Sequence, residues 1–164
     1  MRIGFSSGNS FVSRAIRWFT HSKASHTYIV FTAADEKLVI NANVHGVVCE
    51  HYENYKKHTT IVAEYDIVMS EDEEHTALAY ALKQLLLPYD FLALFGFGWV
   101  LFNKAFGRQV RQPFRNKAAY ICSELVITTL QAPNFPASHL MDREFTSPED
   151  IIDFLDSHNR AKLV

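Results

Sequence analysis

Cysteine is scarce in this sequence, which contains only Cys49 and Cys122 among its 164 residues. Two cysteines do not form the dense, regularly spaced set of a disulfide-stabilised secreted domain, and we therefore expect a reducing compartment. An excess of charge of one sign is also lacking, because 16 basic residues stand against 18 acidic ones and the formal net charge is −2. The chain as a whole therefore lacks the charge signature of a nucleic-acid-binding protein.

Long hydrophobic runs are missing as well. The first twenty residues do not contain the unbroken apolar core of a signal peptide. The uncharged run at residues 91–102 has twelve residues, whereas a membrane-spanning helix needs about 20. These two absences favour the cytoplasm. The eight histidines show no metal-ligand spacing with cysteine or carboxylate residues, so the sequence predicts neither a metal nor a cofactor.

The 48% of apolar residues is enough for one continuous core, and we expect a single domain over residues 1–164. Apolar alternation predicts strands, and helical spacing together with capping signals predicts helices. The predicted strands cover residues 2–6, 26–32, 37–44, 47–50 and 60–69, and the predicted helices cover residues 11–20, 71–87, 91–102 and 122–131, with a last helix starting at residue 148. The expected fold is α+β, an antiparallel sheet packed against helices.

The start of the helix at 122–131 contains the first candidate site residue, Cys122. Unpaired backbone N–H groups and the positive end of the helix dipole favour a thiolate at this position, and the thiolate is the nucleophilic form of cysteine. A nucleophilic cysteine needs a base. His26 opens the strand at 26–32, and we expect His26 and Cys122 to meet. The competing interpretation is a small buried cysteine and a structural histidine.

Four segments occur in an order that is typical of one family. They are residues 13–20 (SRAIRWFT), 25–26 (SH), 88–90 (PYD) and 120–125 (YICSEL), with 147–150 (SPED) as a weaker fifth match. In this order the chain resembles the circularly permuted branch of the NlpC-like papain-fold hydrolases, which includes YiiX-type proteins and lecithin:retinol acyltransferase-like enzymes. The histidine of this branch precedes the cysteine, as His26 precedes Cys122.

The resemblance implies a permuted papain-like fold and a thiol hydrolase mechanism. Cys122 would be the nucleophile and His26 the base that later protonates the leaving group. The position that usually orients the imidazole is Asn41, which hydrogen-bonds but brings no negative charge. Asn43 and His45 compete for this role. The backbone N–H of Cys122 is one candidate oxyanion donor, and the second donor is not assigned.

The aromatic segment between residues 89 and 102 is a candidate for substrate binding. The side chain of Tyr89 lies next to the proposed site in the family pattern, and Phe97 and Trp99 would line an acyl-chain pocket or lie on a membrane surface. The basic, acid-free loop at 103–117 would then meet anionic headgroups. The plainer alternative is a buried helix.

The predicted activity is hydrolysis or acyl transfer at an amide or ester bond through a thioester. A peptide, a cell-wall peptide or an N-acyl amino acid is slightly preferred over a lipid ester. Two other functions remain open: a non-catalytic lipid- or peptide-binding module on the same fold, and a structural component of a larger assembly such as a virus particle.

Overall fold

The computed structural model describes residues 1–88, 103, 107–108, 121–143 and 146–164. These residues form an α+β structure with a six-stranded antiparallel sheet in the order β4-β3-β2-β1-β5-β6. The strands are β1 (Arg2–Ser7), β2 (His26–Ala33), β3 (Glu36–Asn43), β4 (Gly46–His51), β5 (Thr60–Ile67) and β6 (Ala161–Leu163). The helices are α1 (Phe11–Thr20), α2 (Tyr52–His58), α3 (Glu71–Lys83), α5 (Cys122–Gln131) and α6 (Pro148–Asp156), with a short 3-10 helix at Ser138–Leu140.

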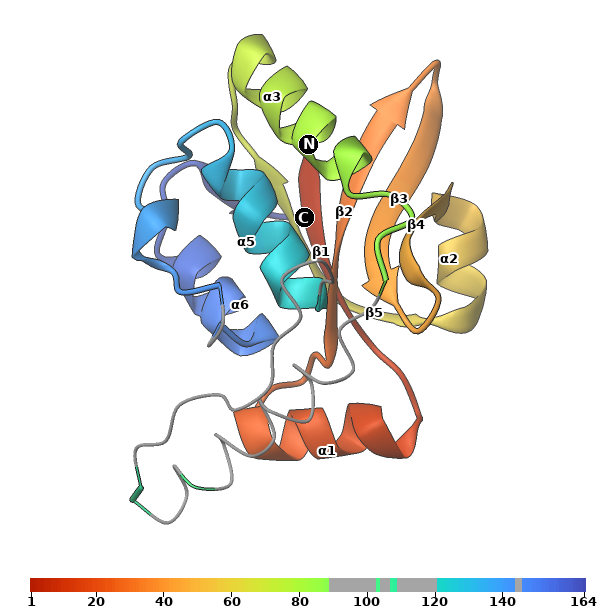
Figure 1. Ribbon diagram of the computed structural model, residues 1–164, viewed down its shortest axis with the longest axis vertical. Helices are drawn as coiled ribbons and strands as arrows, with labels where there is room; N and C mark the ends of the chain where they lie inside the picture. Colours follow the sequence, from red (N-terminus) through yellow and green to blue (C-terminus); the bar gives the residue numbers. More distant parts are fainter. Residues whose placement is uncertain (89–102, 104–106, 109–120, 144–145) are drawn as a thin grey trace.

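Helices cover both faces of the sheet (Figure 1). Helices α5 and α6 lie on one face and α2 on the other, while α1 lies below the lower end of the strands. Side chains of β2 alternate between the two faces. Ile29 and Phe31 join the larger core cluster with α5 and α6, whereas Tyr28 and Val30 join the smaller cluster with α2. Strand β2 therefore contributes side chains to the cores on both faces of the sheet.

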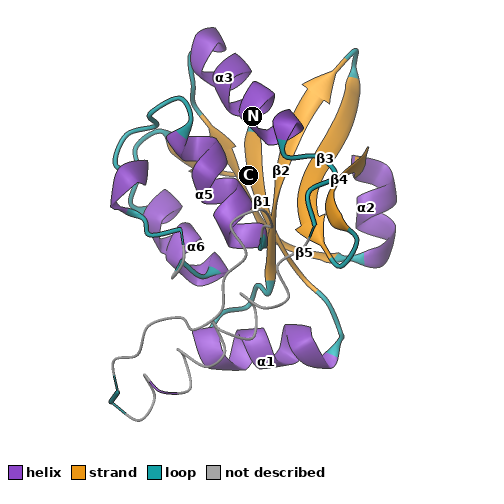
Figure 2. Cartoon of the chain, viewed as in Figure 1, coloured by secondary structure: helices purple, strands orange, loops and turns teal. Residues whose placement is uncertain are grey.

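The helix caps explain where several helices begin; the helices themselves are shown in Figure 2. Ser10 caps α1 by accepting from the backbone N–H of Ser13 at 3.1 Å. Ser70 and Ser147 each form a capping box, with Glu73 in α3 and Asp150 in α6. Such serines satisfy backbone N–H groups that have no partner within the helix.

Three features differ from the sequence prediction. Residues 52–58 form helix α2, and residues 161–163 form β6, whereas neither element was predicted. Helix α3 ends at Lys83, before Pro88, and Leu86 in the turn that follows has a φ of 68°. The predicted helix at 91–102 lies outside the described residues.

Tyr28 ties the sheet to α2 across a glycine. A Cβ atom on Gly4 would lie 2.1 Å from Cζ of Tyr28, so the ring occupies the space that any larger residue would fill. The Tyr28 hydroxyl donates to Oε1 of the buried Glu64 at 2.8 Å, and the Tyr52 hydroxyl of α2 donates to the same oxygen at 2.8 Å. The Arg2 guanidinium donates to Oε2 at 2.9 Å, so the buried carboxylate is fully partnered.

Candidate active site

Cys122 is the first residue of α5, and its sulfur lies among backbone donors. The N-cap residue Ile121 provides no side-chain hydrogen bond to the helix start. The Cys122 sulfur instead accepts from the backbone N–H groups of Cys122 and Ser123. Because Cys122 is only 8% exposed, these donors lie in a setting from which most water is excluded. The Cys122 sulfur thus serves as the hydrogen-bond acceptor that the N-cap side chain does not provide.

A third donor comes from the sheet. The backbone N–H of Thr27 also hydrogen-bonds the Cys122 sulfur. Thr27 directly follows His26 in β2, and its hydroxyl donates to the Gly4 carbonyl of β1 at 3.0 Å. The start of α5 is therefore held against the start of β2. Cys122 therefore lies next to the backbone of the residue that follows His26, although the two segments are almost a hundred residues apart in sequence.

The segment before His26 is fixed from two sides. The hydroxyl of Ser25 shares a buried 2.6 Å hydrogen bond with that of Ser13 in α1. The backbone N–H of Ser25 donates to the Ser6 carbonyl of β1 at 3.0 Å. Ser6 is in turn the register partner of His26. Helix α1 and strand β1 together therefore set the position from which the imidazole projects.

Asn41 lies on the same face of the sheet as His26. Val39 of β3 pairs with Val30 of β2, and alternate residues of a strand share a face. The Asn41 side chain is 1% exposed and hydrogen-bonds the His26 ring. Its amide nitrogen, Nδ2, also donates to Oε1 of Glu50 at 3.4 Å. The structure thus brings together His26 and the residue predicted to orient it.

Burial sets the charge state of both principal residues. Burial lowers the pKa of His26 from 6.5 to about 4, although the hydrogen bond to Asn41 acts in the opposite direction. Burial raises the pKa of the Cys122 thiol, although the three backbone N–H groups lower it. The backbone N–H groups at the helix start therefore lower the thiol pKa, as expected, but the effect of burial is larger. At neutral pH the structure favours a neutral thiol at Cys122 and a neutral imidazole at His26.

Tyr55 of α2 is a neighbour of the site that the sequence did not indicate. Its hydroxyl shares a buried 2.8 Å hydrogen bond with that of Ser6, the strand partner of His26. Burial raises the pKa of Tyr55, and the nearby Cys122 contributes to this increase by its charge. The available signal was the three-residue spacing of Tyr52 and Tyr55, both of which are buried in α2.

The remaining predicted residues divide into two groups. The competitors for the third position lie at the end of β3: the side-chain oxygen of Asn43, the last residue of the strand, accepts from the backbone N–H of His45 in the following turn at 2.8 Å, and His45 is exposed. The substrate-binding candidates Tyr89, Phe97 and Trp99 lie outside the described residues. Cys49 is exposed on the edge strand β4.

The described residues include neither a grouped set of metal ligands nor a membrane-spanning helix. Within these residues, no three or more His, Cys, Asp or Glu side chains are grouped so that they could hold a metal ion. Among the same residues, no helix combines the length and the apolar character required to traverse a bilayer.

Comparison with known proteins identifies the fold. No family model matches the sequence, and no curated protein matches it significantly. The crystal structure of the metalloprotein YiiX from Escherichia coli O157:H7 superposes with a TM-score of 0.58. The two chains share a fold. The match covers 99% of this chain and 94% of YiiX at 20% sequence identity.

Proposed function

We propose that this chain is a cysteine-dependent hydrolase or acyltransferase with a permuted papain-like, NlpC-like fold, acting on an amide or ester carbonyl. One observation carries the proposal: the Cys122 sulfur accepts a hydrogen bond from the backbone N–H of Thr27, the residue after His26. The His26 ring is in turn hydrogen-bonded to Asn41. A nucleophile, a base and an orienting residue at one place are the elements of thiol acyl transfer.

Because both groups are neutral at pH 7, a catalytic His26 would act as a general base rather than as half of a preformed thiolate–imidazolium pair. His26 would take the thiol proton as the Cys122 sulfur attacks the carbonyl carbon, and it would return that proton to the leaving amine or alcohol. The product of this half-reaction is a thioester, which water or a second acceptor then attacks with His26 again acting as base. The backbone N–H groups of Cys122 and Thr27 are candidate donors to the oxyanion.

The substrate class remains a prediction from the sequence. A peptide, a cell-wall peptide or an N-acyl amino acid is preferred over a lipid ester. Tyr89, Phe97 and Trp99 are the proposed substrate-binding residues, and contact of this segment with a membrane surface is part of the same proposal. YiiX is described as a metalloprotein, whereas the described side chains of this chain do not provide a grouped set of metal ligands. The proposed mechanism uses protein groups alone.

A binding module is the second candidate function, and the charge states favour it. A buried thiol with a raised pKa and a histidine with a pKa of about 4 form no thiolate–imidazolium pair at neutral pH. The same site would then bind a peptide or an acyl chain without cleaving it.

Acylation of the thiol distinguishes these two functions. The protein is incubated at pH 7.5 with p-nitrophenyl acetate and with N-acetyl amino acid p-nitroanilides, while product release and intact mass are followed. We expect an acyl adduct on the Cys122 peptide, acetyl from the ester and N-acetyl-aminoacyl from the anilides, in the wild type and in the control Cys49→Ser, which removes the exposed thiol. Cys122→Ala should lose the adduct, and His26→Gln should acylate about 100-fold more slowly.

Two results would contradict the hydrolase. Undiminished product release by Cys122→Ala would assign the activity to another group. The absence of a Cys122 adduct with every acyl donor would favour the binding module.

A further inference from the structure

The amide of Asn41 has a partner at each end. One end hydrogen-bonds the His26 ring, and the other, Nδ2, donates to Glu50 Oε1 at 3.4 Å. Asn41 is 1% exposed, so water does not compete freely for these bonds. The orientation of the amide therefore depends on its two protein partners.

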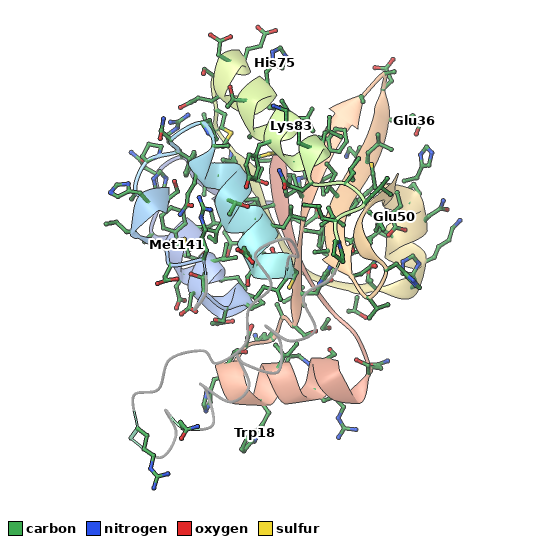
Figure 3. All side chains as sticks on the ribbon, in the orientation of Figure 1. Trp18, Glu36, Glu50, His75, Lys83 and Met141 are labelled. Carbon is green, nitrogen blue, oxygen red and sulfur yellow. The ribbon has the colours of Figure 1, made fainter. Side chains whose placement is uncertain are left out.

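The β3–β4 register puts Glu50 where it can act on Asn41. Asn41 pairs with Val48, and Val39 pairs with Glu50, so Asn41 and Glu50 are diagonal neighbours on the same face of the sheet. The second carboxylate oxygen, Oε2, lies 3.6 Å from Nε2 of His58, the last residue of α2. Figure 3 shows Glu50 beside α2. Helix and strand register together hold the carboxylate behind Asn41.

An ionised carboxylate only accepts hydrogen bonds, so it selects the NH2 end of an amide. With Nδ2 facing Glu50, the carbonyl oxygen of Asn41 faces His26 and accepts from a ring N–H. A neutral imidazole has one N–H, and the group that accepts from it fixes the tautomer. Glu50 also provides a negative charge, which asparagine lacks, on the far side of Asn41 from His26.

We propose that Glu50 is a positioning residue for His26: its carboxylate holds the Asn41 amide so that the carbonyl oxygen fixes one tautomer of the imidazole. The catalytic meaning of this arrangement rests on the proposed function. The positioning itself rests on the Asn41–Glu50 contact and is measurable without a substrate.

Several other groups carry or can acquire charge around this arrangement. They are Cys122 of α5, Tyr55 and His58 of α2, and Cys49 of β4. Among the described residues, none of these groups hydrogen-bonds Nδ2 of Asn41, whose partner is Glu50, so a change at Glu50 is expected to act on His26 chiefly through the amide.

The test is the tautomeric state of His26, read from the two ring nitrogens in 15N-labelled protein at pH 7. We expect one tautomer in the wild type and a mixture in Glu50→Ala, which leaves the amide free to turn. Glu50→Gln retains an accepting oxygen and should restore the single tautomer. The matched control is Glu53→Ala on α2, which removes an exposed carboxylate that pairs with Lys56 at 2.8 Å. An unchanged single tautomer in Glu50→Ala would overturn the proposal.

A charge exchange provides a second test should Glu50→Ala not fold. Asn41→Asp alone brings two carboxylates together, whereas Asn41→Asp combined with Glu50→Gln restores a donor–acceptor pair and places the charge next to His26. The pKa of His26 should rise by at least one unit in the double variant. A pKa equal to that of the wild type would contradict the proposed positioning.

The two proposals fail separately. A tautomer that responds to Glu50 in a protein whose Cys122 is never acylated supports positioning and rejects the hydrolase. A Cys122-dependent hydrolase with an unresponsive tautomer gives the opposite result.

Discussion

His26 links the charge of one side chain to the stability of the fold. Burial lowers the pKa of His26 to about 4, whereas the ordinary value is 6.5. Between these pH values the unfolded chain binds a proton that the folded chain does not. The free energy of unfolding is therefore not reduced by His26 above pH 6.5, and it falls as the pH decreases from 6.5 towards 4.

We predict that this loss reaches about 3 kcal/mol below pH 4, since one pKa unit corresponds to about 1.4 kcal/mol. The measurement is urea unfolding of the wild type and His26→Gln at pH 7.0, 5.5 and 4.5. The free-energy difference between the two proteins should shift in favour of the variant as the pH falls. A difference that stays constant with pH would show that His26 titrates normally in the fold.

Glu64 gives a second prediction at this scale. Its Oε1 accepts from both Tyr28 and Tyr52, and its Oε2 accepts from Arg2. Glu64→Ala leaves these buried donors unpaired and should reduce the free energy of unfolding by about 3 kcal/mol. Glu64→Gln keeps an oxygen for the two tyrosines but presents an NH2 group to Arg2, so it should lose less. Equal losses in urea unfolding would contradict this division of roles.

Two of the candidate site residues are marked locally, whereas Asn41 was indicated by the family resemblance. Cys122 begins a helix, His26 begins a strand, and Asn41 occupies the strand after it. Glu50 and Tyr55 carry no such mark. Their proximity to the site depends on the β3–β4 register and on α2 lying over that face.

At the scale of single elements, β1 depends on a residue without a side chain. Gly4 lies beneath the Tyr28 ring, and its missing Cβ provides the space for that ring. We predict that Gly4→Ala displaces Tyr28 and destabilises the protein by about 1 to 3 kcal/mol. Gly8→Ala is the control, because a Cβ there meets nothing closer than 3.7 Å. Similar thermal unfolding of the two variants would contradict the prediction.

Capping signals account for the prediction of α3 and α6. Ser70 and Ser147 begin α3 and α6 with capping boxes that are visible in the sequence. Helix α2 has His51 at its N-cap, without a side-chain hydrogen bond, and is only seven residues long. Its stability comes from burying Tyr52 and Tyr55 against the sheet, which is tertiary packing. The three-residue β6 likewise exists through its pairing with β5.

At the scale of the whole molecule, the strand order could not be read from the sequence. The N-terminal strand β1 lies inside the sheet between β2 and β5, and β6, from the opposite end of the chain, forms one edge. Local patterns indicate strands and turns but do not specify which distant strands pair. The start of α5 at the start of β2 is a consequence of this long-range arrangement.

Arg160 connects the segment before β6 to the segment between β5 and α3 and to α3 itself. Its Nε donates to the Val68 carbonyl at 2.8 Å and its Nη1 to Glu73 Oε1 at 3.1 Å, so the approach to β6 is joined to the start of α3. The hydrogen bonds from Arg160 and from the Ser70 backbone lower the pKa of Glu73 to about 2. The contribution of this carboxylate is therefore present above pH 4.5 and is lost as the pH falls towards 2.

We predict that Arg160→Ala loosens β6 while the centre of the sheet stays closed. The backbone N–H of Val164, which donates to the Glu64 carbonyl at 3.0 Å, should exchange several-fold faster with deuterium at pH 7. Lys162→Ala, on the same strand, is the control. Faster exchange throughout β1 and β2 would instead mean that Arg160 supports the whole fold.

The strand order also has a consequence for synthesis on the ribosome. Strands β1 to β5 all come from residues 2–67, whereas the helix that carries Cys122 begins 55 residues later. The sheet, with His26, Asn41 and Glu50 in place, can therefore pair while α5 is still untranslated. During that interval the face that α5 later covers is exposed, which makes it a binding surface for chaperones in the nascent chain. The same order of emergence keeps the nucleophile apart from its base until α5 has been synthesised.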